Sequence, residues 1–341
     1  MRKLFKIGFI LIFIIAAALL FVWFGVVNQK IKVEGDEVKV YVRKGDNYES
    51  LLQQLEDKKM IEDMFWFRKM ADFKKLPSHI HEGRYTIKAG MTYNELINYF
   101  RSAQIDVVNV DFHSIRTKDE LAERVSTQIE ASKESILDLL NDDKYMGKFG
   151  LNSENSLVLF LPNKYEMYWN TDAEQFVARM AKEFKKFWTD ERKAKAKSLN
   201  LSQSEVIILA SIVQAEQSKI TTEWPVIAGL YLNRLKIGMP LQSDPTVVYA
   251  HGNFNMNRVY RVHLDIDSPY NTYRRTGLPP GPIYLARKDA IDAVLNAANH
   301  NYFYMCASGD GSYGHNFACT YSDHLKNARM YTQKLNQQGI K

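Results

Sequence analysis

The most hydrophobic part of the chain is a continuous apolar run from Ile7 to Val27 that contains no charged residue. At ~1.5 Å per helical residue, such a run is long enough to cross a hydrocarbon core of ~30 Å. Arg2, Lys3 and Lys6 precede it, so the positive-inside tendency predicts a cytoplasmic N-terminus, with everything after Asn28 outside the membrane. A cleaved signal peptide is the alternative, but the run is longer than a signal core and ends without a clean Ala-x-Ala site.

Two later segments share one pattern of strand, glycine turn and amphipathic helix. The first alternates apolar and charged residues over 38–42, turns at Gly45 and continues into a helix through Leu51. The second, over 87–96, repeats the Gly, Tyr and Leu at the same spacing. This repeated unit resembles the LysM module, which binds glycan chains. An ordinary βα unit with glycine where the turn needs it is the alternative.

The middle and the end of the chain predict further short elements. Alternation over 107–112 predicts a strand, and 114–129 predicts a strand followed by a helix. A charged helix with an apolar seam is expected over 182–197, and residues 303–307 and 317–321 are expected to form a hairpin. We expect a domain boundary near residues 100–110.

One helix stands out because it is apolar on most of its circumference. Ser202 and Glu205 have the spacing of a capping box, and nearly every residue over 206–213 is apolar, which predicts a buried helix. Glu216 follows seven positions after Leu209, close to the buried face. Partial desolvation would raise the pKa of its carboxyl group, as a general acid at neutral pH requires. A glutamate at a frayed helix end that points to water is the alternative.

Polar residues follow this helix in positions that favour a binding site. Asn233 and Arg234 interrupt the apolar face of the next predicted helix, and buried side chains of these types need partners. Asp244 is expected to be the N-cap of a short helix that starts with Pro245 and ends at His251. A long polar and aromatic loop over 268–282 is typical of a binding surface.

Composition narrows the function classes. The 341 residues allow about two domains, and 45 basic against 39 acidic residues give a net charge of only +6, without a basic stripe that would indicate a nucleic-acid binder. The two cysteines, Cys306 and Cys319, are too few for a disulfide framework. They flank the expected hairpin, and we expect free thiols rather than a bridge, since a bridge requires directly opposed positions.

Several motifs together resemble the endolytic murein transglycosylase family, in their residues, order and spacing. The similarity covers nearly the whole chain. The motifs that carry it are Ala210-Ser211-Ile212-Val213-Gln214-Ala215-Glu216, Tyr231-Leu232-Asn233-Arg234-Leu235, Met239-Pro240-Leu241-Gln242-Ser243-Asp244-Pro245-Thr246, Ser268-Pro269-Tyr270-Asn271-Thr272-Tyr273, Gly277-Leu278-Pro279-Pro280-Gly281-Pro282-Ile283 and Gly314-His315-Asn316-Phe317.

This resemblance implies a bacterial enzyme of the inner membrane that cuts glycan strands of peptidoglycan internally and so ends their polymerisation. Glu216 matches the family's essential glutamate. It would protonate the glycosidic oxygen between N-acetylmuramic acid and N-acetylglucosamine and then accept the proton of the muramyl 6-hydroxyl, which leaves a 1,6-anhydromuramyl end. The reaction implies no metal and no cofactor. The residues that we expect to orient the sugar are Asn233, Arg234, Gln242, Asp244, Tyr270, Asn271 and His315.

The chain departs from the family pattern at two places. Leu157-Val158 stands where the family commonly has Glu-Gly, and Asn163-Lys164 replaces Asp-Thr in the segment that follows. Gln214 stands where many members carry a second acidic residue, which leaves Glu216 as the one carboxylate on that turn.

Two other function classes compete with this interpretation. A zinc hydrolase of wall peptides could draw on Cys306, His315, Cys319 and His324, or on His263, Asp265 and Asp267, although neither spacing fits a tight zinc motif. A non-catalytic wall-binding or division scaffold would use the LysM-like unit to bind glycan and would need Glu216 only for structure.

We therefore expect an α+β protein with an N-terminal transmembrane helix. Residues 1–29 would form a cytoplasmic stub and membrane anchor, 30–105 a small LysM-like domain and 106–341 a larger mixed catalytic domain on the periplasmic side. The partners implied are peptidoglycan glycan strands, the membrane and the cell-wall elongation machinery, and not nucleic acid.

Overall fold

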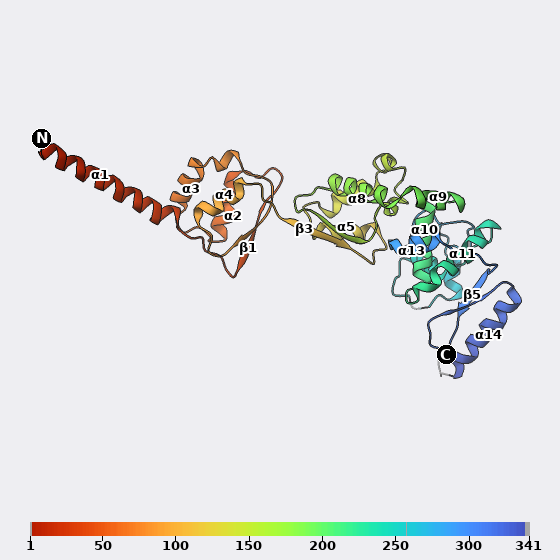
Figure 1. The fold of residues 1–341 in the computed structure, drawn as a ribbon. Helices are drawn as coiled ribbons and strands as arrows, with labels where there is room; N and C mark the ends of the chain where they lie inside the picture. The colour runs from red at the N-terminus through yellow and green to blue at the C-terminus, as the bar shows by residue number, and fades with distance from the viewer. Residues whose placement is uncertain (1, 257, 338–341) are drawn as a thin grey trace. The chain divides into compact units, whose positions relative to one another are not determined.

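The computed structural model describes residues 2–256 and 258–337, which form two compact units (Figure 1). The first unit comprises residues 1–110, 127–131 and 165–172, and the second comprises 111–126, 132–164 and 173–341. Both mix helices with two-stranded sheets, as expected for an α+β chain.

The first unit contains the predicted strand and helix units and, in addition, a helix that was not predicted, α3 (Met64–Phe73). Its elements are α1 (Arg2–Val22), the π-helical turn η1 (Trp23–Val27), β1 (Glu37–Val42), α2 (Tyr48–Asp57), α3, the 3-10 turn η2 (Leu76–Ser78), β2 (Gly83–Lys88), α4 (Tyr93–Arg101) and the start of β3 (Val107–Phe112).

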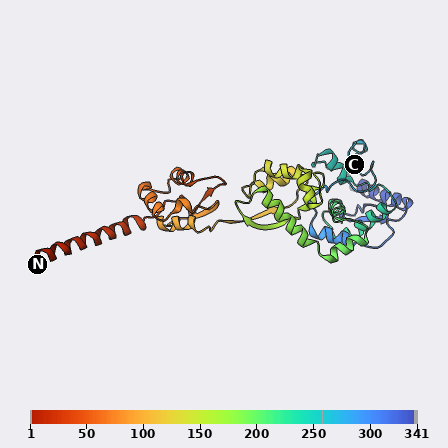
Figure 2. The same ribbon diagram turned by 90° about the horizontal axis from the view of Figure 1, so that it is seen from above.

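The apolar N-terminal run is helical and extends away from the rest of its unit in both Figure 1 and Figure 2. Its side chains are largely exposed, with Phe9 at 73% and Phe13 at 70%. Among the described residues it is the one helix, over Ile7–Val27, that is long and apolar enough to span a membrane, a test that a signal sequence also passes. Val26, at its end, is buried in the core of the first unit.

The repeated strand, turn and helix is confirmed in the first unit. β1 pairs with β2 in antiparallel register, with Val40 opposite Tyr85. Gly45 and Gly90 have φ of 86° and 84°, a left-handed conformation that glycine adopts without strain. Asn47 and Thr92 then cap α2 and α4 through capping boxes. The apolar faces of both helices pack into one core.

The second unit is built mainly from helices. Its elements are the end of β3, α5 (Lys118–Ser126), α6 (Lys133–Asn141), α7 (Asp143–Met146), η3 (Gly147–Phe149), η4 (Ser156–Leu159), the start of β4 (Asn163–Tyr168), α8 (Ala173–Phe187), α9 (Asp190–Ser198), α10 (Gln203–Glu216), η5 (Thr221–Glu223), α11 (Trp224–Lys236), α12 (Asp244–His251), η6 (Arg261–Asp265), α13 (Lys288–Leu295), β5 (Tyr304–Ala307), β6 (His315–Ala318) and α14 (Tyr321–Gln337). β3 and β4 pair in a two-stranded sheet.

The single charged helix expected over 182–197 is wrong, because two helices occupy this stretch. α8 ends at Phe187, and α9 begins after Thr189, whose hydroxyl accepts a hydrogen bond from the Arg192 backbone amide. Phe187 and Trp188 are buried at the break. Burial of two adjacent aromatic side chains and a threonine cap therefore decide the end of α8.

The predicted buried helix is confirmed as α10, which packs against α11 and α13 (Figure 1). The capping box of Ser202 and Glu205 begins it, and every residue from Val206 to Gln214 is buried. Gly229 on α11 permits a close approach, because a Cβ there would lie 2.3 Å from the Ala298 carbonyl oxygen. These three helices form the rigid centre that positions the candidate site.

The C-terminal hairpin is confirmed, but its second strand, expected over 317–321, lies two residues earlier and ends at Ala318. β5 pairs with β6 in antiparallel register, and Cys306 lies opposite Asn316. Cys319 follows β6, is exposed, and both cysteines are free. The two thiols are therefore not opposed across the hairpin, which is the arrangement that a disulfide would require.

We accordingly expect the native protein to contain two free thiols. The masses of the reduced and the unreduced protein should agree, and dithiothreitol should leave the thermal unfolding midpoint unchanged. An unreduced mass lower by two hydrogens would contradict this prediction. A Cys306→Ser variant provides the matched control, since it cannot form an internal bridge.

Candidate functional site

The candidate site is centred on Glu216, the last residue of α10. The helix ends there because Gln217 adopts an extended conformation, with φ −129° and ψ 91°. Its side-chain amide oxygen accepts hydrogen bonds from the backbone amides of Lys219 and Ile220. The turn after Glu216 is therefore fixed, so Glu216 is not at a frayed helix end.

Two hydroxyl groups bind the same oxygen of this carboxyl group. Tyr231 of α11 donates a hydrogen bond to Glu216 Oε1 at 2.8 Å, and Ser243 Oγ donates a second, short one. One helix and the residue before another thus hold the carboxyl group in place through Oε1, and within residues 2–256 and 258–337 no protein group hydrogen-bonds to Oε2. The fixed orientation is what a proton donor needs.

Asp244 is not the N-cap of the short helix, contrary to the prediction. Ser243 is the N-cap, and Asp244 is the first residue of α12, followed by Pro245. The Ser243 hydroxyl makes no capping bond, because it donates to Glu216 instead. Asp244 Oδ1 accepts a hydrogen bond from the Tyr273 hydroxyl at 2.6 Å. Both side chains are therefore used by the site rather than by the helix end.

Burial raises the pKa of Glu216, although the hydrogen bonds from Ser243 and Tyr231 oppose that rise. The Asp244 carboxylate adds to the increase, and His315 lowers the pKa slightly. The net pKa lies above the ordinary glutamate value. A carboxyl group that keeps its proton to higher pH can serve as a general acid.

A second polar cluster lies on the side of His315. The His315 backbone amide donates to Glu223 Oε1 at 2.9 Å, and its ring Nδ1 lies 2.7 Å from Glu223 Oε2. Gln217 also donates to Glu223. Burial raises the pKa of Glu223, but these hydrogen bonds lower it further, so the net pKa lies below the usual range. Glu223 therefore orients His315 as a carboxylate.

Three predicted site residues donate hydrogen bonds from their side chains to backbone carbonyl oxygens. Arg234 donates to Phe303 O at 2.6 Å and to Leu241 O at 2.7 Å, and Asn233 donates to His300 O and Tyr302 O. Asn271 donates to Leu264 O and Ile266 O. Direct contact of these side chains with a sugar stays a prediction, while their observed bonds hold the loops around Glu216.

Gln242 and Tyr270 lie at the edges of the site. Gln242 is exposed, and its φ of 52° is unusual for a residue with a side chain; its backbone amide donates to Thr272 O at 3.0 Å. The Tyr270 ring lies 4.7 Å from the Tyr249 ring, and burial raises the pKa of the Tyr270 hydroxyl. Both residues can meet a ligand, and neither contacts Glu216 in the described bonds.

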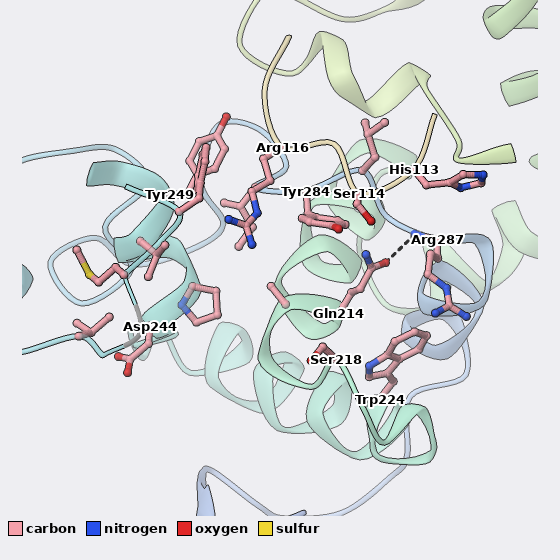
Figure 3. A pocket seen from close by; sticks show the side chains of 18 of the residues that line it. His113, Ser114, Arg116, Gln214, Ser218, Trp224, Asp244, Tyr249, Tyr284 and Arg287 are labelled. Carbon is pink, nitrogen blue, oxygen red and sulfur yellow. Dashed lines mark hydrogen bonds between the residues drawn. The ribbon is translucent and has the colours of Figure 1, made fainter. Parts of the chain in front are cut away.

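An open cavity of about 890 Å³ begins beside Glu216 (Figure 3). Ala215, Ser218 and Asp244 line it, although Glu216 itself does not. In Figure 3 the cavity runs between α10, which carries Gln214, together with Ser218 in the turn that follows it, and α12, which carries Asp244 and Tyr249. Gln214 Oε1 accepts a hydrogen bond from the Arg287 backbone amide at 2.8 Å. The volume suits a ligand of several sugar rings.

The roles of Tyr231, Ser243 and Glu223 were not predicted from the sequence. Tyr231 and Ser243 lie inside the family motifs, and Ser243 is of a type common at helix N-caps. Glu223 carried no such signal, because its partner His315 is far away in sequence and only the fold brings them together.

Among residues 2–256 and 258–337, no group of three or more His, Cys, Asp or Glu side chains is arranged to hold a metal ion. Cys306 lies opposite Asn316 on the hairpin, His315 is bound to Glu223, and the His324 ring stacks on Tyr304 at 5.4 Å. The four residues considered for zinc thus have separate surroundings.

Comparison with known proteins agrees with the motifs. The sequence pattern of the YceG-like family matches residues 40–330. The chain belongs to this family. The resemblance stated from the motifs is therefore confirmed.

Several curated relatives of this YceG-like chain are named endolytic murein transglycosylase. The Bacillus subtilis protein is 26% identical over 88% of this chain and 86% of its own length. Proteins from two Streptococcus pneumoniae strains are 36% identical, but over only 41% of this chain and 26% of their own length. The crystal structure of a putative YceG-like protein from Listeria monocytogenes has a TM-score of 0.55 with 23% identity, covering 86% of this chain and 99% of that one. That likeness concerns the fold.

The raised pKa of Glu216 predicts how stability depends on pH. A carboxyl group with a raised folded pKa contributes stability below its ordinary pKa of ~4.3, and this contribution is lost as pH rises through the folded value. Glu216→Gln should therefore gain stability relative to the wild type between pH 4 and pH 8, measured by thermal unfolding. Glu174→Gln, which changes an exposed glutamate of α8, is the control. A difference between Glu216→Gln and wild type that does not change with pH would contradict the prediction.

Proposed function

We propose that this protein is an endolytic murein transglycosylase that cleaves the bond between N-acetylmuramic acid and N-acetylglucosamine inside peptidoglycan glycan strands. The observation that carries the proposal is a desolvated glutamate, Glu216, held by Tyr231 and Ser243 beside an open cavity in a chain of the YceG-like family. The names of the curated relatives support the same activity.

The chemistry requires one carboxyl group used twice. Protonated Glu216 donates its proton to the glycosidic oxygen as the bond to the muramyl C1 breaks. The resulting carboxylate accepts the proton of the muramyl 6-hydroxyl, whose oxygen bonds to C1 of the same sugar, so no water is consumed. An intramolecular nucleophile can have an effective molarity of ~10⁵ M or more, which removes the need for an enzyme nucleophile. The products are a 1,6-anhydromuramyl end and a free N-acetylglucosamine end.

The other site residues have positioning and binding roles in this proposal. Gln242, Asp244, Tyr270 and His315 contact the sugar, and Asn233, Arg234 and Asn271 act through the backbone segments that they bind. Asp244 and His315 also act on the charge of Glu216. His315 is held by Glu223, so its ring has one defined orientation.

The rest of the chain brings this site to its substrate. We propose that residues 1–29 anchor the protein in the inner membrane with the N-terminus in the cytoplasm, that the LysM-like segment 30–105 contacts glycan, and that 106–341 carries the catalysis. The strand, turn and helix repeat supports the LysM-like assignment. Cleavage of nascent strands close to the membrane would end their polymerisation. The enzyme would then work together with the cell-wall elongation machinery.

Glu216→Gln should lower strand cleavage by ~10²–10⁴-fold while the protein stays folded, because an amide of nearly the same shape cannot donate and then accept the proton. The measurement is digestion of uncrosslinked glycan strands in detergent, followed by chromatography. Glu174→Gln, on the exposed face of α8, serves as the control and should digest at the wild-type rate. Wild-type digestion by Glu216→Gln would instead favour a non-catalytic wall-binding scaffold.

Mass spectrometry of the same digests identifies the reaction class. Products of a transglycosylase lack one water relative to hydrolysis products, since the muramyl oxygen displaces the leaving group. Only reducing muramic ends would indicate a hydrolase, which needs a second carboxylate, and Asp244 would be the first candidate.

The proposed orientation predicts that Cys319 is accessible from outside the cell. A membrane-impermeant maleimide should label intact cells that make the wild-type protein, because Cys319 is an exposed free thiol. A Cys319→Ser variant should lose most of this label. Labelling only after lysis would contradict the orientation.

A further inference from the structure

A wall of the cavity carries a guanidinium group that the proposed acid chemistry does not use. Arg116 precedes α5, is half-buried and lines the cavity beside the candidate acid. In Figure 3 its side chain points into the space between α12, which carries Tyr249, and α10, which carries Gln214. None of the family motifs quoted above contains Arg116.

Aromatic rings hold this side chain in one orientation. Its guanidinium carbon lies 4.6 Å from the centre of the Phe254 ring and 5.7 Å from that of Tyr284. Cation–π contacts of this kind are made to the faces of the rings and leave the guanidinium N–H groups as donors for a ligand.

Within the described part of the chain, Arg116 forms no ion pair. Glu120 accepts a hydrogen bond from the backbone amide of Arg116 at 2.7 Å, not from its guanidinium group. Asp244, the one carboxylate among the lining residues, accepts from Tyr273. A fixed guanidinium in a partly desolvated cavity without a carboxylate partner favours binding of an anion.

The charge of the cavity agrees with an anionic ligand. Arg258 and Arg287 line it together with Arg116, against the single carboxylate of Asp244. Arg287 is already paired with Asp289, and Arg258 is exposed over the Tyr260 ring, whereas Arg116 is half-buried. Arg116 is thus the guanidinium best placed to form a new bidentate bond inside the cavity.

We propose that Arg116 binds a carboxylate carried by the lactyl substituent of the muramyl residue and so positions the glycan for Glu216. This inference rests on the proposed function and assigns to the Arg116 guanidinium the recognition of the muramyl residue. N-acetylglucosamine carries no such substituent. In peptide-bearing strands the carboxylates belong to the stem peptide, and in strands stripped of peptide the lactyl group itself ends in one. Binding at Arg116 would therefore set which sugar occupies the position next to the acid.

The test compares Arg116→Met with wild type on three substrates in full-length protein. They are peptide-bearing strands, the same strands with their carboxyl groups converted to amides by carbodiimide and ammonia, and strands stripped by an amidase. Methionine keeps the apolar stem between the rings. We expect KM on carboxylate-bearing strands to rise about tenfold with kcat little changed, because the lost bond is present in both the ground and the transition state.

The pattern over the substrates identifies the source of the carboxylate. A loss confined to peptide-bearing strands assigns the stem peptide, and a loss confined to stripped strands assigns the lactyl group. Amidated strands should be poor substrates for wild type, and Arg116→Met should add no further loss on them. Arg116→Lys, which keeps the charge without the planar fork, should give an intermediate KM.

The control is Arg179→Met, which removes a guanidinium from the α8 pair with Glu183, a helix that contributes no residue to the cavity lining. A KM change for Arg116→Met that equals that of Arg179→Met, or that is the same on all three substrates, would overturn the inference. Thermal unfolding checks that Arg116→Met is folded. If the wild-type protein cuts none of the strands, the proposed function itself is wrong. That outcome is distinguishable from a failure of the inference about Arg116, because it is seen without any variant.

Discussion

One constraint governs the arrangement of the second unit: a carboxyl group is partly buried at the end of a buried helix. α10 is buried along nearly its whole length, and Glu216 at its end lies half-buried in a polar corner, where burial raises the pKa of its carboxyl group. Such a group costs free energy unless it keeps its proton or finds hydrogen-bond donors. Tyr231 and Ser243 supply those donors, and each must be held at the correct distance.

Ser243 is held by a network that reaches across several loops. Its backbone amide donates to Thr272, and its carbonyl accepts from Thr246. Arg234 binds the carbonyls just before it, at 240 and 241. A short hydroxyl side chain can keep a fixed bond to Glu216 only because the backbone that carries it cannot move. Residues of the family motifs therefore stabilise the position of Glu216 through bonds within the protein.

The surroundings of Glu216, here called the acid corner, and the cavity beside them have opposite electrostatic character. The corner raises the proton affinity of a carboxyl group through burial and through Asp244, whereas the cavity wall carries guanidinium groups that favour an anion. In the proposed function, a neutral glycosidic oxygen would meet the first of these surroundings and a charged substituent of the sugar the second. This division is compatible with one enzyme carboxyl group doing all the proton transfer.

The sequence alone determined the apolar N-terminal helix, the repeated strand and helix unit and the buried α10 that ends at Glu216, because periodicity and capping spacing are local properties of the chain. It did not determine that Ser243 rather than Asp244 is the N-cap, that α8 ends at Phe187, or that Glu223 holds His315. Those features depend on which partners the fold brings together from distant segments. The hydroxyl of Ser243 had a local use as a cap and a distant one at Glu216, and only the packing of α10 against its neighbours decided between them.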